Sequence, residues 1–412
     1  MRELPSPTDR LLTASHALLP DLVALRREIH RDPEVGLDLP RTQQRVLSAL
    51  AGLDLEVTTG TGLSSVVAVL RGGRPGPTVL LRADMDALPI AEQSGLPYAS
   101  TSSAMHACGH DLHIAGLVGA ARLLDGIRDE LAGNVVLMFQ PGEEGHAGAA
   151  KMIDEGLLEI TGELPVAAYA VHVRPGPRGT FVSRPGAVTA SMSRLAVTVH
   201  GRGGHGSRPH EACDPVPVLA EVVLALQSFV TRRFDVFDPV VVSVGSLAAG
   251  VGAANVICDS ASLTGTVRTM SPHTLSVLKE ALPRLVEGIA AAHDTTATVE
   301  LSTGYPSVVN DPALTGAVLS RLRHAFGENR VLEAPTPTMG AEDFSFITQR
   351  VPGAMFLLLA TPPGHPGVPA PNHSPHAVFD DSVLADQAAA LALLAAQTLA
   401  SHATAPTDGS PS

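Results

Sequence analysis

Short apolar runs alternate with longer stretches of helical periodicity along most of the chain. The apolar runs predict buried strands at 65–70, 78–83, 134–140, 166–171 and 355–360. Between or after them, apolar positions recur at helical spacing over 11–30, 41–50, 114–124, 148–155 and 381–399. Strands that alternate with helices in this way predict an α/β fold with a mixed, mainly parallel sheet that is flanked by helices.

One internal segment has a different order of elements. It reads strand (195–200), helix (215–232), strand (240–247), strand (262–269), helix (272–292), strand (295–301). This β-α-β-β-α-β order is that of a ferredoxin-like domain. We therefore expect a larger domain built from 1–188 and 304–402, a small domain inserted at 189–303, and a disordered polar tail at 403–412.

The composition narrows the class of protein. The 412 residues are 45% hydrophobic but only 3% aromatic, which predicts a mainly aliphatic core. A formal net charge of −13 disfavours nucleic acid and anionic membranes as partners. The cysteine count of three does not fit a disulfide framework, and neither an apolar leader nor a run of about 18 apolar residues is present. We therefore expect a cytoplasmic protein without a membrane span.

The densest group of reactive side chains lies at 105–113. It contains Cys108 together with His106, His110 and His113. Cysteine and histidine are the side chains that bind zinc-like ions, and Cys108 and His110 can face the same way in an extended turn. The alternative is a redox or structural cysteine with surface histidines, but the density of the group favours a metal site.

Two adjacent carboxylates, Glu143 and Glu144, follow the apolar run at 134–140. Ligands bind at the strand ends of open α/β sheets. Two carboxylates in different environments can divide metal binding and proton transfer between them. The alternative for such a pair is a solvated acidic turn.

Histidines and aspartates follow three further apolar runs. His172 ends one run, His373 lies in a proline-rich loop after another, and Asp84 and Asp86 follow a third. The aspartates are suited to accept hydrogen bonds from metal-bound histidines. A core histidine or an ordinary turn could explain each of them alone. Together with the two groups above, the two histidines complete a ligand set for two ions.

A glycine-rich stretch at 201–210 lies in the inserted segment and contains His205. Its glycines satisfy the G-x-G-x-x-G pattern of dinucleotide-binding loops, but prolines follow where that pattern needs a helix. The stretch therefore favours a tight turn that carries His205 toward a ligand. Arg268 ends another predicted strand, where it could pair with a substrate carboxylate or be an ordinary surface arginine.

Several motifs occur in a fixed order along the chain: RADMDALP (82–89), MHACGHDLH (105–113), QPGEEG (140–145), GGHGSRPH (203–210), GAEDF (340–344) and NHS (372–374). Together they resemble the aminoacylase/carboxypeptidase-type metallo-amidohydrolases, in the branch of hippurate hydrolase, N-acyl-amino-acid deacetylases and auxin-conjugate hydrolases. The resemblance implies a catalytic domain interrupted by a smaller lid domain that often dimerises.

The resemblance also implies a role for each matching residue. The implied metal ligands are Cys108, His110, Glu144, His172 and His373. Glu143 would be the general base, and Asp84 and Asp86 would lie beside the site. His205 would stabilise the oxyanion, in some cases from a partner subunit, and the lid residues at the substrate would be Asn255 and Arg268. No role is assigned to His113. The chain departs from the family pattern at 190–193, where an acidic residue is expected before the lid strand.

These inferences predict hydrolysis of an N-acyl amino acid, such as an N-acetyl or N-benzoyl derivative, to a carboxylic acid and a free amino acid. A cysteine ligand favours two ions of the borderline class, Zn, Mn, Co or Ni, over calcium or magnesium. We expect a homodimer or a larger homo-oligomer. A metallo-dipeptidase or aminopeptidase on the same fold is the alternative.

Two rivals belong to other classes. A nucleotide-dependent oxidoreductase would bind NAD(P) and would be insensitive to chelators. A non-catalytic metal-binding protein would contain metal but would turn over no N-acyl amino acid.

Overall fold

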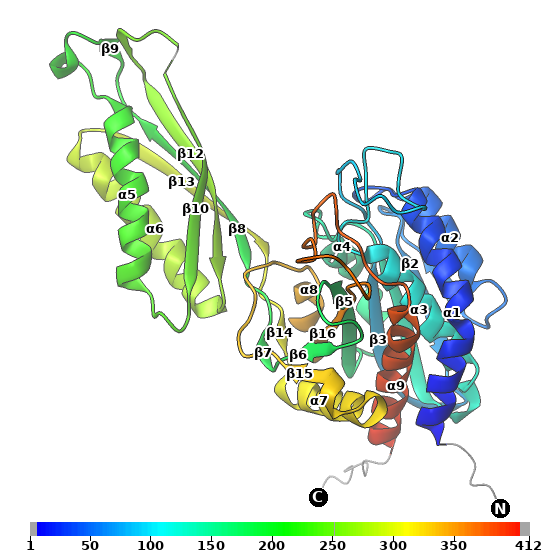
Figure 1. Ribbon diagram of the computed structural model, residues 1–412. Helices are drawn as coiled ribbons and strands as arrows, with labels where there is room; N and C mark the ends of the chain where they lie inside the picture. The colour runs from blue at the N-terminus through cyan, green and yellow to red at the C-terminus, as the bar shows by residue number, and fades with distance from the viewer. Residues whose placement is uncertain (1–5, 251, 404–412) are drawn as a thin grey trace, which may run out of the picture. The chain divides into compact units, whose positions relative to one another are not determined.

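The computed structural model describes residues 6–250 and 252–403, which divide into two compact units (Figure 1). The first unit contains the described residues of Met1–Val188, Val309–Thr336 and Phe346–Ser412, and the second contains Thr189–Val308 and Pro337–Ser345. This division differs from the expected boundaries at 304–308 and 337–345. The lid role of the inserted segment stays a prediction, and the expected tail lies outside the described residues except for Ala403.

The first unit is built on a mixed sheet with the strand order β1-β2-β4-β3-β5-β16-β6-β15. Its strands are β1 (Glu56–Thr59), β2 (Val66–Arg71), β3 (Arg74–Asp84), β4 (Ala132–Gln140), β5 (Ala167–Arg174), β6 (Phe181–Ser183), β15 (Val331–Glu333) and β16 (Gly353–Leu359). The central pairs β4–β3, β3–β5 and β5–β16 are parallel, whereas β1–β2, β2–β4 and β16–β6 are antiparallel. β7 (Gly186–Ala187) and β14 (Val309–Asn310) form a separate antiparallel ribbon, and β14 contacts β16 of the large sheet.

Helices flank the sheet. They are α1 (Pro7–Arg31), α2 (Pro40–Leu50), α3 (His110–Asp125), α4 (Gly148–Asp154), α7 (Pro312–Phe326), α8 (Ser345–Thr348) and α9 (Val383–Ala403). α3 and α9 pack on each other and on β3, and α1 packs on both of them. α4 contacts β4, and α7 contacts β6, β15 and β16. The predicted α/β class, with helices around a mixed sheet, is confirmed.

The second unit has the predicted ferredoxin-like order of elements. Its sheet β10-β12-β8-β13 is antiparallel throughout, with β8 (Met192–His200), β10 (Val240–Ala249), β12 (Ser260–Thr269) and β13 (Thr296–Tyr305). Helices α5 (Pro215–Arg233) and α6 (Pro272–Ala292) pack on this sheet. Asp214 and Ser271 begin these helices by accepting hydrogen bonds from the backbone of the first turn. A short ribbon of β9 (Gly204–His205) and β11 (Val256–Ile257) interrupts the pattern.

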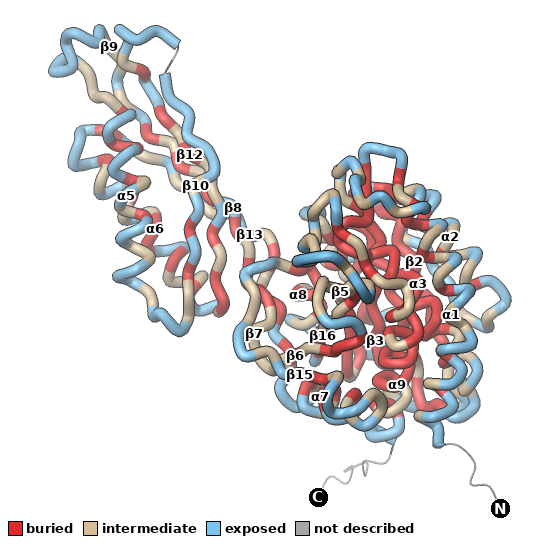
Figure 2. The backbone as a smooth tube through the Cα atoms, in the orientation of Figure 1, coloured by how far each residue is buried: buried red, intermediate tan, exposed pale blue. Residues whose placement is uncertain are grey.

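Burial concentrates on the central strands and on α3 and α9 of the first unit (Figure 2). The core is largely aliphatic, as the composition predicted. By length and composition, α5 and α9 could each cross a membrane. In α9, however, 78% of the apolar window is buried inside the protein, so α9 serves here as the core helix of the first unit.

A buried ionic network joins α1 to the start of α3. Arg26 and Asp111 are fully buried, and Arg26 Nε donates to Asp111 Oδ2 over 2.6 Å. His30 lies between two carboxylates, with Nδ1 2.7 Å from Asp111 Oδ2 and Nε2 3.1 Å from Glu92 Oε1. Because a buried charge needs a partner, this network fixes where α3 begins relative to α1.

The network predicts how stability depends on pH. Burial lowers the pKa of His30, but Asp111 and Glu92 outweigh burial and raise the pKa above its ordinary value, although Arg26 opposes them. A histidine whose folded-state pKa is raised contributes stability that is fully present below about pH 6.5 and is lost as the pH rises through the folded pKa. The loss in unfolding free energy on His30→Gln should therefore be larger at about pH 6 than at about pH 9.

Urea unfolding of the wild type and of His30→Gln at both pH values measures this difference. His16→Gln, a change at an exposed histidine of the same helix, is the control and should have little effect at either pH. A His30 effect that is independent of pH would contradict the charge-paired interpretation.

Candidate metal centre

The candidate site lies at the carboxyl ends of adjacent parallel strands. β3 ends at Asp84, and β4 ends at Gln140 shortly before Glu143. β5 carries His172 near its carboxyl end, where His172 pairs with Leu357 of β16. Parallel strands bring their carboxyl ends to one edge of a sheet. The sheet topology therefore explains why residues far apart in sequence meet there.

A left-handed glycine shapes the turn between Cys108 and His110. Gly109 has φ +83°, and a Cβ there would lie 2.3 Å from Val173 Cγ2, so only glycine fits. His110 opens α3, and its Nδ1 lies 2.7 Å from the backbone carbonyl of Asp86, to which Nδ1 donates. Its Nε2 is buried and has no hydrogen-bond partner among the described residues. A histidine that binds a metal through one ring nitrogen has no protein partner on that nitrogen, and His110 Nε2 fits this description.

His172 has the neutral form that a ligand needs. Its Nδ1 donates to the backbone carbonyl of Val173 over 2.8 Å, and its Nε2 lies 3.4 Å from Cys108 Sγ. Burial, with the neighbouring His113, holds the pKa of His172 well below its usual range. Nε2 therefore keeps a lone pair that faces the cysteine sulfur.

His373 reaches the same cluster from a distant loop. Its Nε2 lies 3.0 Å from Glu144 Oε1, and hydrogen bonding to Cys108 and to Glu144 raises the pKa of His373 to about 10. The backbone of His373 is left-handed, with φ +69°, which is uncommon for a residue with a side chain. Asn372 holds this loop in place by donating to the carbonyls of Cys108 and Val173.

Asp86 organises the two glutamates. Its Oδ1 accepts the backbone N–H of Glu143 and its Oδ2 accepts that of Glu144, both over 2.9 Å. Asp86 is itself 1% exposed, and its backbone carbonyl accepts from His110. One buried residue thus sets the position of His110 and of the Glu143–Glu144 turn together.

Asp84 has a different role from Asp86. It binds His113, a residue for which the sequence gave no role. Its Oδ1 accepts from Nδ1 of the fully buried His113, and its Oδ2 accepts from Arg82 Nη1 over 2.5 Å. Burial opposes ionisation of Asp84, but Arg82, His110 and His113 lower its pKa well below the usual range. The spacing of the 105–113 motif gave no signal for the partner of His113, because the contact depends on how α3 lies across β3.

Overlapping groups of these side chains could hold an ion. Within each group the candidate ligand atoms lie within 4.8 Å of one another: Cys108, His110 and His172; Cys108, Glu144 and His373; His110, Glu143 and Glu144; Asp84, His110 and His113. The first two groups share the cysteine and together contain each of the five predicted ligands. A set of thiolate, imidazole and carboxylate donors fits a borderline divalent ion better than calcium or magnesium. The residues therefore fit the class of ion that was predicted.

The remaining predicted site residues belong to the second unit. His205 lies in β9, paired with Val256, and its Nδ1 accepts from the backbone N–H of Ser207 over 3.1 Å. That bond leaves the ring proton on Nε2, where it is available for donation. The backbone carbonyl of Asn255 accepts from the backbone N–H of Gly206, and the side chain of Arg268 donates to the carbonyl of Met339 over 2.7 Å. Each of the three residues is at least partly exposed within the second unit.

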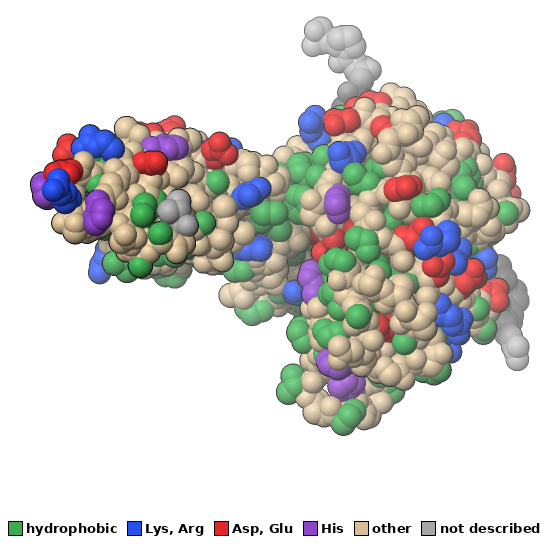
Figure 3. All heavy atoms as spheres, turned by 90° about the horizontal axis from the view of Figure 1, so that it is seen from above, with side chains coloured by type: hydrophobic (Ala, Val, Ile, Leu, Met, Phe, Trp, Pro, Cys, Tyr) green, Lys and Arg blue, Asp and Glu red, His purple; other side chains and the backbone are tan. Residues whose placement is uncertain are grey.

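Exposed polar side chains follow His205 along the chain. Arg208, His210 and Glu211 follow it and are more than half exposed, with Arg208 3.2 Å from Glu211. Figure 3 shows histidine, basic and acidic side chains gathered at one end of this unit. The glycine-rich stretch does not open a long helix: a short 3-10 helix (Pro209–Glu211) follows, and α5 begins only at Pro215. This geometry disfavours a dinucleotide-binding loop.

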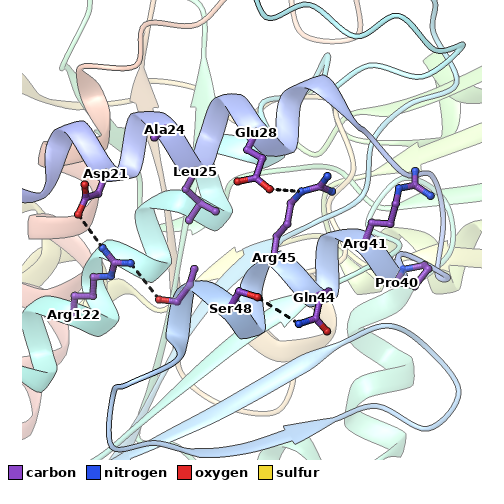
Figure 4. Close-up of a pocket in the computed structure, with 11 residues that line it drawn as sticks. Asp21, Ala24, Leu25, Glu28, Pro40, Arg41, Gln44, Arg45, Ser48 and Arg122 are labelled. Carbon is purple, nitrogen blue, oxygen red and sulfur yellow. Dashed lines mark hydrogen bonds and ion pairs between the residues drawn. The ribbon is translucent and has the colours of Figure 1, made fainter.

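A cavity of about 740 Å³ lies between α1 and α2, and no predicted site residue lines it (Figure 4). Four of its charged side chains form two ion pairs: Arg45 Nε lies 3.0 Å from Glu28, and Arg122 Nη1 lies 3.5 Å from Asp21. Arg41, which also lines the cavity, pairs with Asp32 outside it. None of the residues that line this cavity belongs to the Cys108 cluster.

These features define a metal-dependent hydrolase of amide bonds. The chain belongs to peptidase family M20/M25/M40, whose family model matches residues 80–397. The fold and the family that the motifs indicated are thereby confirmed.

Relatives and solved structures agree. Thermostable carboxypeptidase 2 of Saccharolobus solfataricus is 37% identical over 91% of this chain and 94% of its own length. N-acetyl-L-cysteine deacetylase of Bacillus subtilis is 35% identical over 84% of this chain and 81% of its own length. The crystal structure of a dinuclear metal-binding peptidase of the M20 family from Bacillus subtilis matches with a TM-score of 0.81 and 31% identity, over 93% of this chain and 99% of that one.

The position of Asp86 generates a prediction. Asp86→Ala removes both acceptors for the Glu143 and Glu144 backbone, so metal affinity should fall by about 10- to 100-fold. Asp86→Asn keeps one acceptor oxygen and should lose less. Competition with a chelator measures both affinities. Asp54→Ala, at a 93% exposed carboxylate, is the control, and an Asp86→Ala protein that binds metal as tightly as this control would disprove the role of Asp86.

Proposed function

We propose that the protein hydrolyses N-acyl amino acids to a carboxylic acid and a free amino acid. The observation that supports this most directly is the convergence of Cys108, His172 and the buried free nitrogen of His110 beside the adjacent Glu143 and Glu144. A relative that is named a deacetylase of N-acetyl-L-cysteine adds support for the substrate class. The partner that we propose is this small amide substrate, without nucleic acid or a membrane.

The ligands that we propose for two divalent ions are Cys108, His110, Glu144, His172 and His373. Zn, Mn, Co and Ni are the candidates, because the thiolate excludes a purely hard-ion site. When bound, such ions supply Lewis-acid chemistry that polarises an amide carbonyl and acidifies water. Asp84 and Asp86 orient the ligands through His113, His110 and the glutamate backbone.

Glu143 is the residue that we propose moves the proton. It is 6% exposed, and its backbone is held by Asp86, so its carboxylate sits in a defined, largely dry position. It would take a proton from the attacking water and return it to the leaving amine nitrogen. The breaking of the C–N bond then releases the carboxylic acid and the amino acid.

The second unit would contribute substrate contacts. The Nε2–H of His205 is a donor suited to a developing oxyanion, because Ser207 occupies its Nδ1. Arg268 would pair with the substrate carboxylate, and Asn255 would contact the substrate beside it. We also propose that the protein forms a homodimer through this unit, in which His205 could serve the site of the partner subunit.

A cytoplasmic location is proposed as well, because it suits the free cysteines Cys108, Cys213 and Cys258.

A carboxypeptidase or dipeptidase activity is the second candidate. The 37% identity to a protein named thermostable carboxypeptidase 2 favours it. A panel that contains N-acetyl, N-benzoyl and longer N-acyl amino acids beside dipeptides and longer peptides separates the two. Higher kcat/KM for N-acyl amino acids than for any peptide supports the first proposal, and the reverse order supports the second.

Glu143→Gln tests the proton-transfer role. The amide is nearly the same shape but cannot accept a proton at neutral pH, so kcat should fall by about 10²- to 10⁴-fold while metal content stays at the wild-type value. Steady-state kinetics and elemental analysis of the same preparation give both quantities. Glu130→Gln, at an exposed surface carboxylate, is the control. Undiminished turnover by Glu143→Gln would remove Glu143 from this role.

Metal removal makes a separate prediction. Dialysis against a chelator should abolish activity and lower the thermal midpoint, because an ion that binds only the folded state stabilises it. Zn, Mn, Co or Ni should restore both, whereas calcium or magnesium should not. Full hydrolytic activity in metal-free protein would contradict the metal-dependent mechanism. Restored metal without turnover of any amide would favour the non-catalytic alternative.

A further inference from the structure

His113 is fully buried in the first turn of α3, and both of its ring nitrogens are engaged. Nδ1 donates to Asp84 Oδ1 at the end of β3. Nε2 accepts the backbone N–H of Val173 in β5 over 2.8 Å. The two bonds fix the tautomer, with the proton on Nδ1. His113 therefore has no lone pair left for an ion, although it belongs to one of the candidate ligand groups.

Val173 connects this histidine to the proposed ligands. Its N–H is taken by His113, and its carbonyl accepts from His172 Nδ1 over 2.8 Å and from Asn372 Nδ2 over 3.1 Å. Asn372 also donates to the carbonyl of Cys108 over 3.2 Å. The Val173 backbone is thus the point at which the rings of His172 and His113 and the His373 loop are tied together.

The other side of His113 is also fixed. The side chain of Gln387, fully buried in α9, lies with Nε2 3.4 Å from the His113 carbonyl. Gly116, one turn further along α3, leaves the room for it, because a Cβ there would lie 2.2 Å from Gln387 Nε2. The ring is consequently held between two strands while its backbone is held by a helix.

We propose that His113 is a positioning residue, which sets the place of His172 in the metal centre by holding the backbone N–H of Val173 at the end of β5. The proposal rests on the proposed metal site and extends it to a residue that is not a ligand. Its two hydrogen bonds have distinct consequences. The bond to Val173 fixes the backbone that carries His172, whereas the bond to Asp84 ties that anchor to β3. Loss of the Val173 bond should therefore affect metal binding more than loss of the Asp84 bond.

Two amide variants separate these bonds. In His113→Gln, the amide lies close to the place of Nε2, so Oε1 can accept from Val173 while the donor to Asp84 is lost. In His113→Asn, the amide lies close to the place of Nδ1, so the donor to Asp84 is kept while the acceptor for Val173 is lost. His113→Phe keeps the ring and removes both bonds. His106→Phe is the matched control, since His106 is equally buried in the same motif and neither of its ring nitrogens has a hydrogen-bond partner among the described residues.

The experiment measures the affinity of each purified protein for Co²⁺ by competition with a chelator, the absorption spectrum of the Co²⁺-loaded protein, and the thermal midpoint of the metal-free protein. We expect Co²⁺ affinity to fall by about 10- to 100-fold in His113→Asn and His113→Phe, with an altered spectrum, because orienting partners of ligands have effects of this size. His113→Gln should retain most of the affinity and the wild-type spectrum. His106→Phe should match the wild type in both.

Other results would overturn the proposal. Wild-type Co²⁺ affinity and spectrum in His113→Asn would do so, even with a lowered thermal midpoint, since that pattern belongs to a purely structural histidine. A loss in His113→Gln that exceeds the loss in His113→Asn would also do so, because Asp84 rather than Val173 would then be the important partner. If His113→Phe does not fold, the two amide variants decide alone. A wild-type protein that binds no Co²⁺ would instead refute the metal site itself.

Discussion

The hydrogen bonds to Asp86 are the constraint on which the site depends. One carboxylate accepts the backbone N–H groups of Glu143 and Glu144, and the backbone carbonyl of the same residue accepts from His110. These bonds join the end of β3, the turn after β4 and the start of α3. Because Asp86 is buried, it cannot exchange these donors for water, so leaving any of them unpaired would be costly. Asp86 thus fixes the ring of His110 through its carbonyl, and the backbone of the two glutamates through its carboxylate.

Much of the fold could be predicted because the hydrophobic pattern reports burial directly. Central strands such as β4 and β5 are continuous apolar runs, which is what a parallel sheet with both faces covered requires. The inserted unit was recognisable from its order of elements. The pattern did not reveal α7 (Pro312–Phe326), nor the short strands β6 and β15 at the edge of the sheet, which have few buried positions from which a period can be read.

The candidate site could be predicted as a set of residues but not as a network. Cys108, His110, Glu144, His172 and His373 were identifiable because their motifs follow strands and because cysteine and histidine have few other uses at that density. Asp84 and Asp86 were expected beside the site, but the backbone groups that hold the ligands in place were not identifiable. Asn372 and His113 act through the backbone of Val173, and main-chain donors and acceptors leave no trace in the sequence. Which backbone group a side chain meets is decided only when α3 and the loop before α9 settle on the sheet.

The account stands on the claim that the side chains around His110 Nε2 and Cys108 Sγ hold divalent ions. Anomalous diffraction from crystals of the unmodified protein, collected above and below the absorption edge of the metal found by elemental analysis, tests it most directly. The account predicts strong difference peaks within coordination distance of these two atoms, and their loss in a crystal of His110→Ala. Peaks confined to other surfaces of the protein, with none beside Cys108, would contradict it.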